Sequence, residues 1–264
     1  MSHSSLSSRG GHVGVGFVLL LIVISVVADK QAPSGERLFL CNVAQPFDAA
    51  FKLHPDSGVI NKQYVFKGNK VWVYDAEYRS TSLEGTIASV FPGLPINNID
   101  AAVATNSGNM FYVFKGVNVY LFDIASGLKS GFPKTIASEF SGAFPNHIDA
   151  VQRGDLNKIY AYKGSQVFAY HELTGQLGGF PKAHNLGFSP DAAIQSPFQR
   201  LSISVDTYYF VGNMTHLVES NVEVPTSPFP ICSSCSGTKV INSGTSGDIA
   251  PFVDSIYTNL QTCK

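Results

Sequence analysis

The sequence predicts an all-β fold, a four-bladed β-propeller with short peripheral helices. A phrase of five residues, YVFKG at 64–68, recurs at 112–116 and returns as YAYKG at 160–164 and YYFVG at 208–212. The tyrosines that begin the four copies are each 48 residues apart. Each copy alternates its side chains with the period of a β-strand, so every repeat predicts a small sheet. Such a sheet cannot bury both its faces alone, and stacking four of them in a closed ring does so.

The N-terminal segment has the pattern of a secretory signal. Arg9 lies in a Ser-rich head, and an apolar run at 13–27 follows it and ends beside Ala28 in a small-residue cleavage site. We therefore expect residues 1–28 to be a signal peptide, residues 29–40 to be a short linker, and the mature chain to be secreted without a membrane span. The alternative is a signal anchor, for which the apolar run is short.

Composition supports a folded extracellular domain and excludes one class of partner. The chain is 44% hydrophobic and 14% charged, which suits a buried core and argues against disorder. Aromatic residues make up 12% and stand mostly in short runs beside valine, as strands favour. The net charge is −1 and no run of Lys or Arg occurs, so we expect no nucleic-acid partner.

Each repeat predicts three strands and a peripheral segment. The first strand begins at an Asp-Ala pair, the second is the YVFKG phrase, and the third returns after Gly68, where a hairpin needs positive φ. In the second strand Tyr64 and Phe66 share one face. Segments that contain GFPK, at 131–140 and 179–185, have room for an outer strand and a short helix. The predicted repeats lie at about 45–95, 97–145, 146–188 and 189–235, and residues 236–264 form an unmatched C-terminal tail.

This order of motifs resembles hemopexin-type repeats. The pattern runs from Asp-Ala-Ala through Y-x-F-x-G to an aromatic pair that ends in Asp, best seen in Trp72, Tyr74 and Asp75, and the resemblance covers residues from about 41 to 235. It implies a narrow central channel in which main-chain carbonyls at the start of the inner strands hold Ca²⁺ or Na⁺. The residues that match are Asp48, Asp100, Asp149 and Asp191.

The physical chemistry of such a hub agrees with this expectation. Four inner strands that converge on one axis leave room only for small side chains, which we expect to be Ala49, Ala101, Ala150 and Ala192. Carbonyl oxygens that point inward need partners, and a hard cation accepts several of them. The alternative is that water fills the channel and the Asp side chains cap neighbouring turns.

Four cysteines in an oxidising compartment predict disulfides. The hemopexin resemblance implies a bridge from Cys41, before the first repeat, to Cys232 or Cys235 after the last. A Cys41–Cys263 bridge with a small Cys232–Cys235 loop is equally consistent, so the pairing stays open. Asn213 begins the glycosylation sequon of the chain.

Lysines follow the second strand of three repeats. Lys67, Lys115 and Lys163 occupy equivalent positions, and Val211 interrupts the set in the fourth repeat. We expect their ammonium groups to surround the channel mouth on the Asp side, where they would attract an anionic partner. The alternative is that they only solvate a turn.

No catalytic motif is convincing, so we expect a binding protein and not an enzyme. The stretch that starts with His171 and Glu172 resembles a zinc-protease motif but lacks the second His. The predicted role is non-catalytic recognition of extracellular partners, namely matrix proteins, cell-surface components or glycans. The alternative is a heme or small-ligand carrier, for which His147 and His184 are the candidate ligands.

Overall fold

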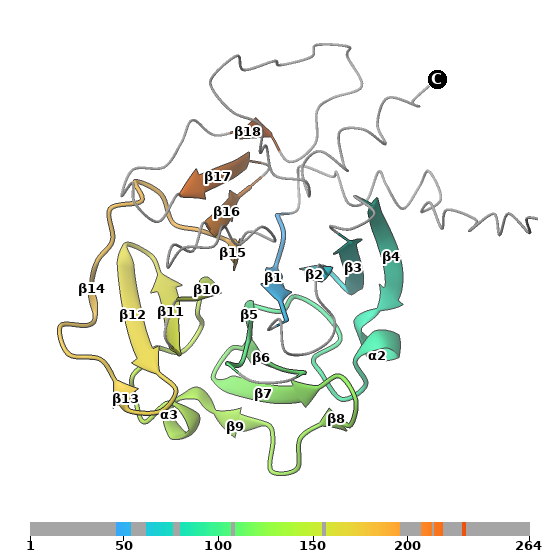
Figure 1. Ribbon diagram of the computed structural model, residues 1–264, viewed down its shortest axis with the longest axis horizontal. Helices are drawn as coiled ribbons and strands as arrows, with labels where there is room; N and C mark the ends of the chain where they lie inside the picture. The colour runs from blue at the N-terminus through green and yellow to red at the C-terminus, as the bar shows by residue number, and fades with distance from the viewer. Residues whose placement is uncertain are drawn as a thin grey trace, which may run out of the picture. The chain divides into compact units, whose positions relative to one another are not determined.

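The computed structural model of the chain describes the residues 46–53, 62–75, 80–106, 109–154, 157–195, 207–212, 214–218 and 229–230 (Figure 1). The predicted signal peptide and linker, the four cysteines, Asn213 and the C-terminal tail lie outside these residues. Within them, no helix has the length and apolar character that crossing a membrane requires.

The described strands form four antiparallel sheets, called blades 1 to 4 in chain order. Blade 1 contains β1 (Ala49–Lys52), β2 (Lys62–Lys67), β3 (Lys70–Asp75) and β4 (Ser80–Thr86). Blade 2 contains β5 (Ala101–Ala104), β6 (Met110–Lys115), β7 (Asn118–Asp123), β8 (Gly127–Leu128) and β9 (Lys134–Thr135). Blade 3 contains β10 (Ala150–Arg153), β11 (Lys158–Lys163), β12 (Gln166–His171), β13 (Gly175–Gln176) and β14 (Lys182–Ala183). Blade 4 contains β15 (Ala192–Gln195), β16 (Thr207–Val211), β17 (Met214–Val218) and β18 (Phe229–Pro230).

The inner strands close a ring. Strand β1 contacts β5 and β15, and β10 contacts the same two strands, so each blade meets two neighbours. Figure 1 shows the four inner strands at the centre and the later strands of each blade further out. The predicted all-β four-bladed propeller is therefore confirmed.

Side-chain alternation gives every blade two buried faces. In β2, Tyr64 and Phe66 face blade 2 and pack with Phe111 and Val113 of that blade. The opposite face of blade 2 packs on blade 3, and blade 3 packs on blade 4 in the same way. The blades thus stabilise one another through aromatic and aliphatic side chains that are buried between adjacent sheets.

The hairpin after the second strand is the same in all four blades. Its glycine takes a left-handed conformation, with φ of 59° at Gly68, 62° at Gly116, 55° at Gly164 and 57° at Gly212. A side chain with a Cβ is strained in this region, which explains why the YVFKG phrase ends in Gly.

The outer parts of the blades differ from one another. Blade 1 has one continuous outer strand, β4, whereas the outer strands of blades 2 and 3 are each broken into two short pieces. The helices α2 (Ile87–Val90) and α3 (Ile136–Glu139) follow blades 1 and 2, and each is capped by a threonine side chain.

The predicted helix after the second GFPK segment is wrong. Residues 184–190 contain no helix. Ala183 stands where Thr135 caps α3, and His184 stands where Ile136 begins it. Without a capping oxygen the first free N–H groups of a helix lack a partner. The connection is also shorter in sequence, with 9 positions from Lys182 to Asp191 against 15 from Lys134 to Asp149.

Candidate cation-binding channel

The inner strands of the four blades enclose a narrow channel. Its wall begins at the second residue after each inner Asp and is formed by all four inner strands. The cavity has a volume of about 10 Å³, which is room for about one water molecule or ion. The wall residues nearest the Asp end are Ala50, Ala102, Val151 and Ala193.

The alanines predicted at the hub do not themselves line the cavity, which begins at the next residue of each strand. Ala49, Ala101 and Ala150 pack in the apolar cores between blades. The residues that follow alanines of this set, Ala102, Val151 and Ala193, pack in the same cores and also line the cavity. Val151 also shows that the wall admits more than alanine.

Each of the four inner aspartates makes the same hydrogen bond. In each blade the carboxylate Oδ2 accepts the N–H of the hairpin glycine at 2.6 Å, and the four pairs are Asp48–Gly68, Asp100–Gly116, Asp149–Gly164 and Asp191–Gly212. These side chains cap the turns beside the channel mouth. The sequence contained both partners of each bond but did not show that they meet, because the loop between them varies in length.

The channel wall contains open strand edges. Each inner strand pairs with a single neighbour in its own sheet, so its other edge is open toward the channel. Edge strands present main-chain carbonyl and amide groups that need partners. Carbonyl oxygens are ligands for Ca²⁺ and Na⁺. Main-chain oxygens at the start of these strands, at Asp48, Asp100, Asp149 and Asp191, remain the predicted ligands.

Burial and neighbouring charges shift the pKa values of two groups at the channel mouth. Burial raises the pKa of Asp48 to about 6, against the opposing effects of the Gly68 N–H and of the ammonium groups of Lys115 and Lys67. Burial also lowers the pKa of Lys67 to about 8. A cation in the channel would favour the ionised form of this carboxyl.

The three lysines do not form the predicted ring of exposed ammonium groups. Lys67 is 2% exposed, and its Nζ lies 5.5 Å from the centre of the Phe47 ring. Lys115 donates to the carbonyl of Asn98 and to Asp100 Oδ1, the latter at 3.0 Å. Lys163 donates to the carbonyl of His147. Lys67 is therefore not available at the surface, and the anion site stays a prediction for Lys115 and Lys163.

The two histidines predicted as heme ligands lie in different connections between blades. His147 is exposed, has a φ of 53°, and donates its backbone N–H to the Gly116 carbonyl at 2.8 Å. Both ring nitrogens of His184 have partners: Nε2 lies 2.9 Å from the Gly164 carbonyl, and Nδ1 accepts the Leu186 N–H at 3.4 Å. His184 thus has a structural role in this conformation.

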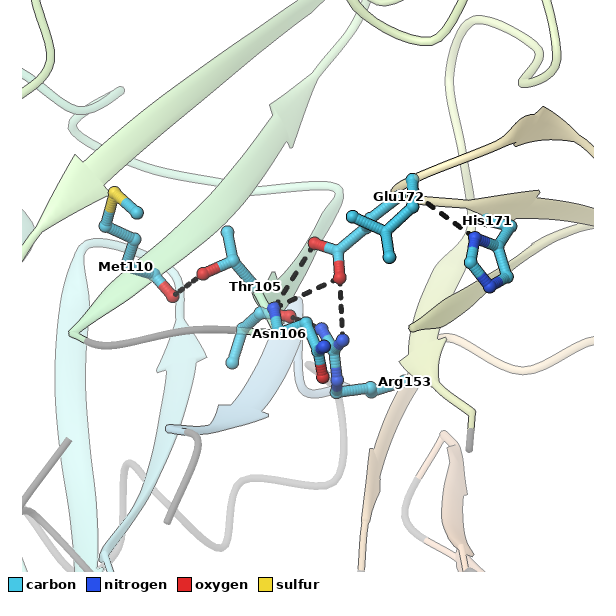
Figure 2. A network of polar contacts seen from close by, with 8 residues as sticks. Thr105, Asn106, Met110, Arg153, His171 and Glu172 are labelled. Atoms are coloured by element: carbon cyan, nitrogen blue, oxygen red, sulfur yellow. Dashed lines mark hydrogen bonds and ion pairs between the residues drawn. The ribbon is translucent and has the colours of Figure 1, made fainter. Parts of the chain in front are cut away.

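Sequence reasoning missed a polar network at the opposite end of the inner strands (Figure 2). Arg153 of blade 3 donates from Nη1 to the carbonyl of Ala104 in blade 2 and from Nη2 to Glu172, both at 2.7 Å. The carboxylate of Glu172 also accepts the N–H of Asn106, with oxygen distances of 3.1 and 3.3 Å. The available signal was a charged residue at the end of a short apolar strand. In the part of the chain that the structure describes, no three His, Cys, Asp or Glu side chains converge as a metal site.

Known proteins share this architecture. No family model matches the chain. A segment of 90 residues is 32% identical to human hemopexin and covers 33% of this chain and 18% of that protein. The chain thus spans only a small part of that relative, so this similarity does not establish a shared activity.

Solved plant structures cover more of the fold. The chain is similar to hemopexin fold protein CP4 from cow pea, with a TM-score of 0.57, 22% identity, and coverage of 70% of this chain and 92% of that one. It is similar to a plant lectin with two metal binding sites from Cicer arietinum, with a TM-score of 0.56, 19% identity, and coverage of 80% and 95%. A plant albumin from the same species that shows hemagglutination has a TM-score of 0.56, 20% identity, and coverage of 70% and 92%. The resemblance read from the repeats is confirmed at the level of the fold, which is that of hemopexin.

Proposed function

We propose that this chain is a secreted, non-catalytic binding module that holds a hard cation in its channel and recognises glycans or proteins at cell surfaces or in the extracellular matrix. The observation that carries the proposal is the channel, where four open strand edges meet around space for about one ion. The predicted repeats at 45–235 supply the module, and the predicted leader at 1–28 supplies the route out of the cell.

The similar structures support a recognition role. One of them is described as a lectin with two metal binding sites, and another as an albumin that shows hemagglutination. Both descriptions fit a propeller that presents several blades to a cell surface.

The cation is tested by thermal unfolding of the mature chain in EDTA, in CaCl₂ and in NaCl, with choline chloride at equal ionic strength as the control. A ligand that binds only the folded state at 100 times its Kd adds about 2.7 kcal/mol of stability. We expect Ca²⁺ or Na⁺ to raise Tm and choline not to. An unchanged Tm together with no bound ion in elemental analysis would reject the channel site.

The partner class is tested by agglutination of erythrocytes and by binding to immobilised glycans. We expect agglutination that soluble sugars compete away, and the absence of both activities would contradict cell-surface recognition. A heme carrier is less well supported, because both nitrogens of His184 already have partners. Titration with hemin separates the two roles, since ligation by histidine changes the visible absorbance of the pigment.

A further inference from the structure

Blades 2 and 3 repeat one outer element. In each, a Phe-Pro peptide in the cis form precedes a lysine, and the pairs are Phe132–Pro133 before Lys134 and Phe180–Pro181 before Lys182. The two lysines hold equivalent places, since Lys134 pairs with Val119 and Lys182 with Val167. Each ammonium group lies over the preceding phenyl ring, at 4.7 Å in blade 2 and 5.1 Å in blade 3.

In blade 2 this element holds a carboxylate from the chain itself. Glu139 Oε2 accepts from Lys134 Nζ at 2.7 Å, and Glu139 Oε1 accepts from the hydroxyl of Tyr112 at 3.0 Å. Burial, followed by the Glu139 carboxylate, raises the pKa of Tyr112, so this phenol remains a donor. The site therefore shows how a lysine and a tyrosine on one blade grip a carboxylate.

In blade 3 the carboxylate is missing and the other parts remain. Glu139 belongs to α3, whereas residues 183–190 of blade 3 form no helix and contain no Asp or Glu. This connection therefore supplies no carboxylate to Lys182. Lys182 is exposed, and no carboxylate among the described residues forms an ion pair with it.

Tyr160 takes the position of Tyr112, and its ring centre lies 6.1 Å from that of Phe180. The surroundings suit a ring-shaped ligand better than a peptide. Phe180 and Phe188 are partly exposed and pack against the same core cluster, and His216 lies beside Phe188. A peptide would need an open strand edge, but the outer strand of blade 3 consists of two pieces of two residues each.

We propose that the rim of blade 3 binds the carboxylate of an acidic sugar at the place that Glu139 fills in blade 2, with Lys182 as the principal donor. This inference deepens the proposed recognition of glycans and rests on it. Charge-assisted hydrogen bonds to a carboxylate are the stronger ones, so the carboxylate supplies most of the selectivity between acidic and neutral sugars.

The test is calorimetric titration of the whole mature protein with 3′-sialyllactose and, as the neutral match, lactose. We expect one site for sialyllactose, and binding of lactose at least about tenfold weaker, as loss of one such bond of about 1.4 kcal/mol implies. Lys182→Ala should lower affinity for sialyllactose by about tenfold, and the matched Lys134→Ala should leave it unchanged. Circular dichroism verifies that both variants are folded.

A gain-of-site variant tests the geometry independently. Glu139→Ala should empty the equivalent place in blade 2 and raise the stoichiometry for sialyllactose from one to two. Equal affinity in wild type and Lys182→Ala would overturn the site while leaving glycan recognition intact. Binding of an acidic peptide at Lys182 without binding of sialyllactose would overturn the sugar assignment. Agglutination of erythrocytes without any binding of sialyllactose would overturn the inference but not the proposed function.

Discussion

The interface between blades 2 and 3 and the interface between blades 3 and 4 are built from the same repeat but are filled differently. Between blades 2 and 3, Ile136, Phe140 and Phe144 are 0%, 1% and 4% exposed. Phe140 and Phe144 contact Tyr170 of the next blade at ring distances of 5.1 and 5.9 Å. Arg153 and Glu172 of blade 3 add polar links across the same interface, because Arg153 donates to the Ala104 carbonyl and Glu172 accepts from the Asn106 N–H. The interface is therefore closed at both its inner and outer parts.

Between blades 3 and 4 the equivalent places hold smaller or more polar groups. His184 and Phe188 replace Ile136 and Phe140, and both are partly exposed. Val218 stands in the register position of Tyr170. The buried part is held by a chain of hydrogen bonds in which Gln152 donates to the Tyr162 hydroxyl at 2.7 Å and the hydroxyls of Tyr162 and Tyr209 lie 2.8 Å apart.

The difference shows how a repeat protein divides stability and recognition. The peripheral segment of one interface is buried, whereas the other has a rim with partly exposed rings, where we propose that a carboxylate binds. The predictions below test this contrast.

The largest expected effect is a cavity at the closed interface. Phe140→Ala should lower the free energy of unfolding by about 3–5 kcal/mol, because a fully buried ring is lost. Phe188→Ala should cost only about 1–2 kcal/mol, because its ring is already partly solvated. Urea denaturation of both variants measures the difference, and equal losses would remove the contrast between the interfaces.

The ion pair at the same interface should matter nearly as much. Arg153→Met should destabilise by about 3 kcal/mol, since it leaves the Glu172 carboxylate, with a side chain only 15% exposed, with fewer donors. A double-mutant cycle with Glu172→Leu should give a coupling above about 1 kcal/mol. Strictly additive losses would show that the two side chains act separately.

The helix cap offers a smaller, matched comparison. Thr135 accepts the Ser138 N–H at 3.2 Å and caps α3, so Thr135→Ala should cost about 1 kcal/mol. Ala183→Thr places a threonine at the equivalent position of blade 3, where no helix follows, and should change stability by less than about 0.5 kcal/mol. A stabilisation near 1 kcal/mol by Ala183→Thr would mean that blade 3 lacks its helix only for want of the cap.

The smallest effect depends on pH and falls on the open interface. His216 packs on Phe188 at 4.1 Å, and burial lowers its pKa below the ordinary value of 6.5. The folded state therefore binds fewer protons here than the unfolded state, and this contribution to stability is lost as pH falls below about 6.5. Since the ring is largely solvated, we expect less than about 0.5 kcal/mol. His216→Phe should abolish this part of the pH dependence, measured by hydrogen exchange of blade 4 between pH 7 and 5, and an unchanged profile would contradict it.

Much of the fold was predictable because it depends on short-range patterns in the sequence. The period of two in YVFKG set the faces of the second strands, and the glycine set the hairpins, since both depend on neighbours along the chain. The GFPK segments marked the outer strands of blades 2 and 3. The helix after the second of them was mispredicted because a cap and a starting isoleucine had been replaced, a change visible in Ala183 and His184.

The site was less predictable because its parts meet only after folding. Asp48 and Gly68 are 20 residues apart, and Asp149 and Gly164 are 15 apart, yet both pairs make the same bond of 2.6 Å. Nothing in the local sequence distinguishes a lysine that is buried over Phe47 from one that is exposed. The hydrogen bond from Arg153 to the Ala104 carbonyl likewise depends on how blades 2 and 3 dock.

The sequence by itself determined the number of blades, the strand and hairpin pattern and the small residues of the hub, because repeats and alternation are properties of the chain. Tertiary structure alone decided which residues of the inner strands line the channel, which lysines are exposed, and that Lys134 forms an ion pair whereas Lys182 forms none with the described residues. Those outcomes depend on which faces and which ends of neighbouring blades come together, and packing between distant segments sets that.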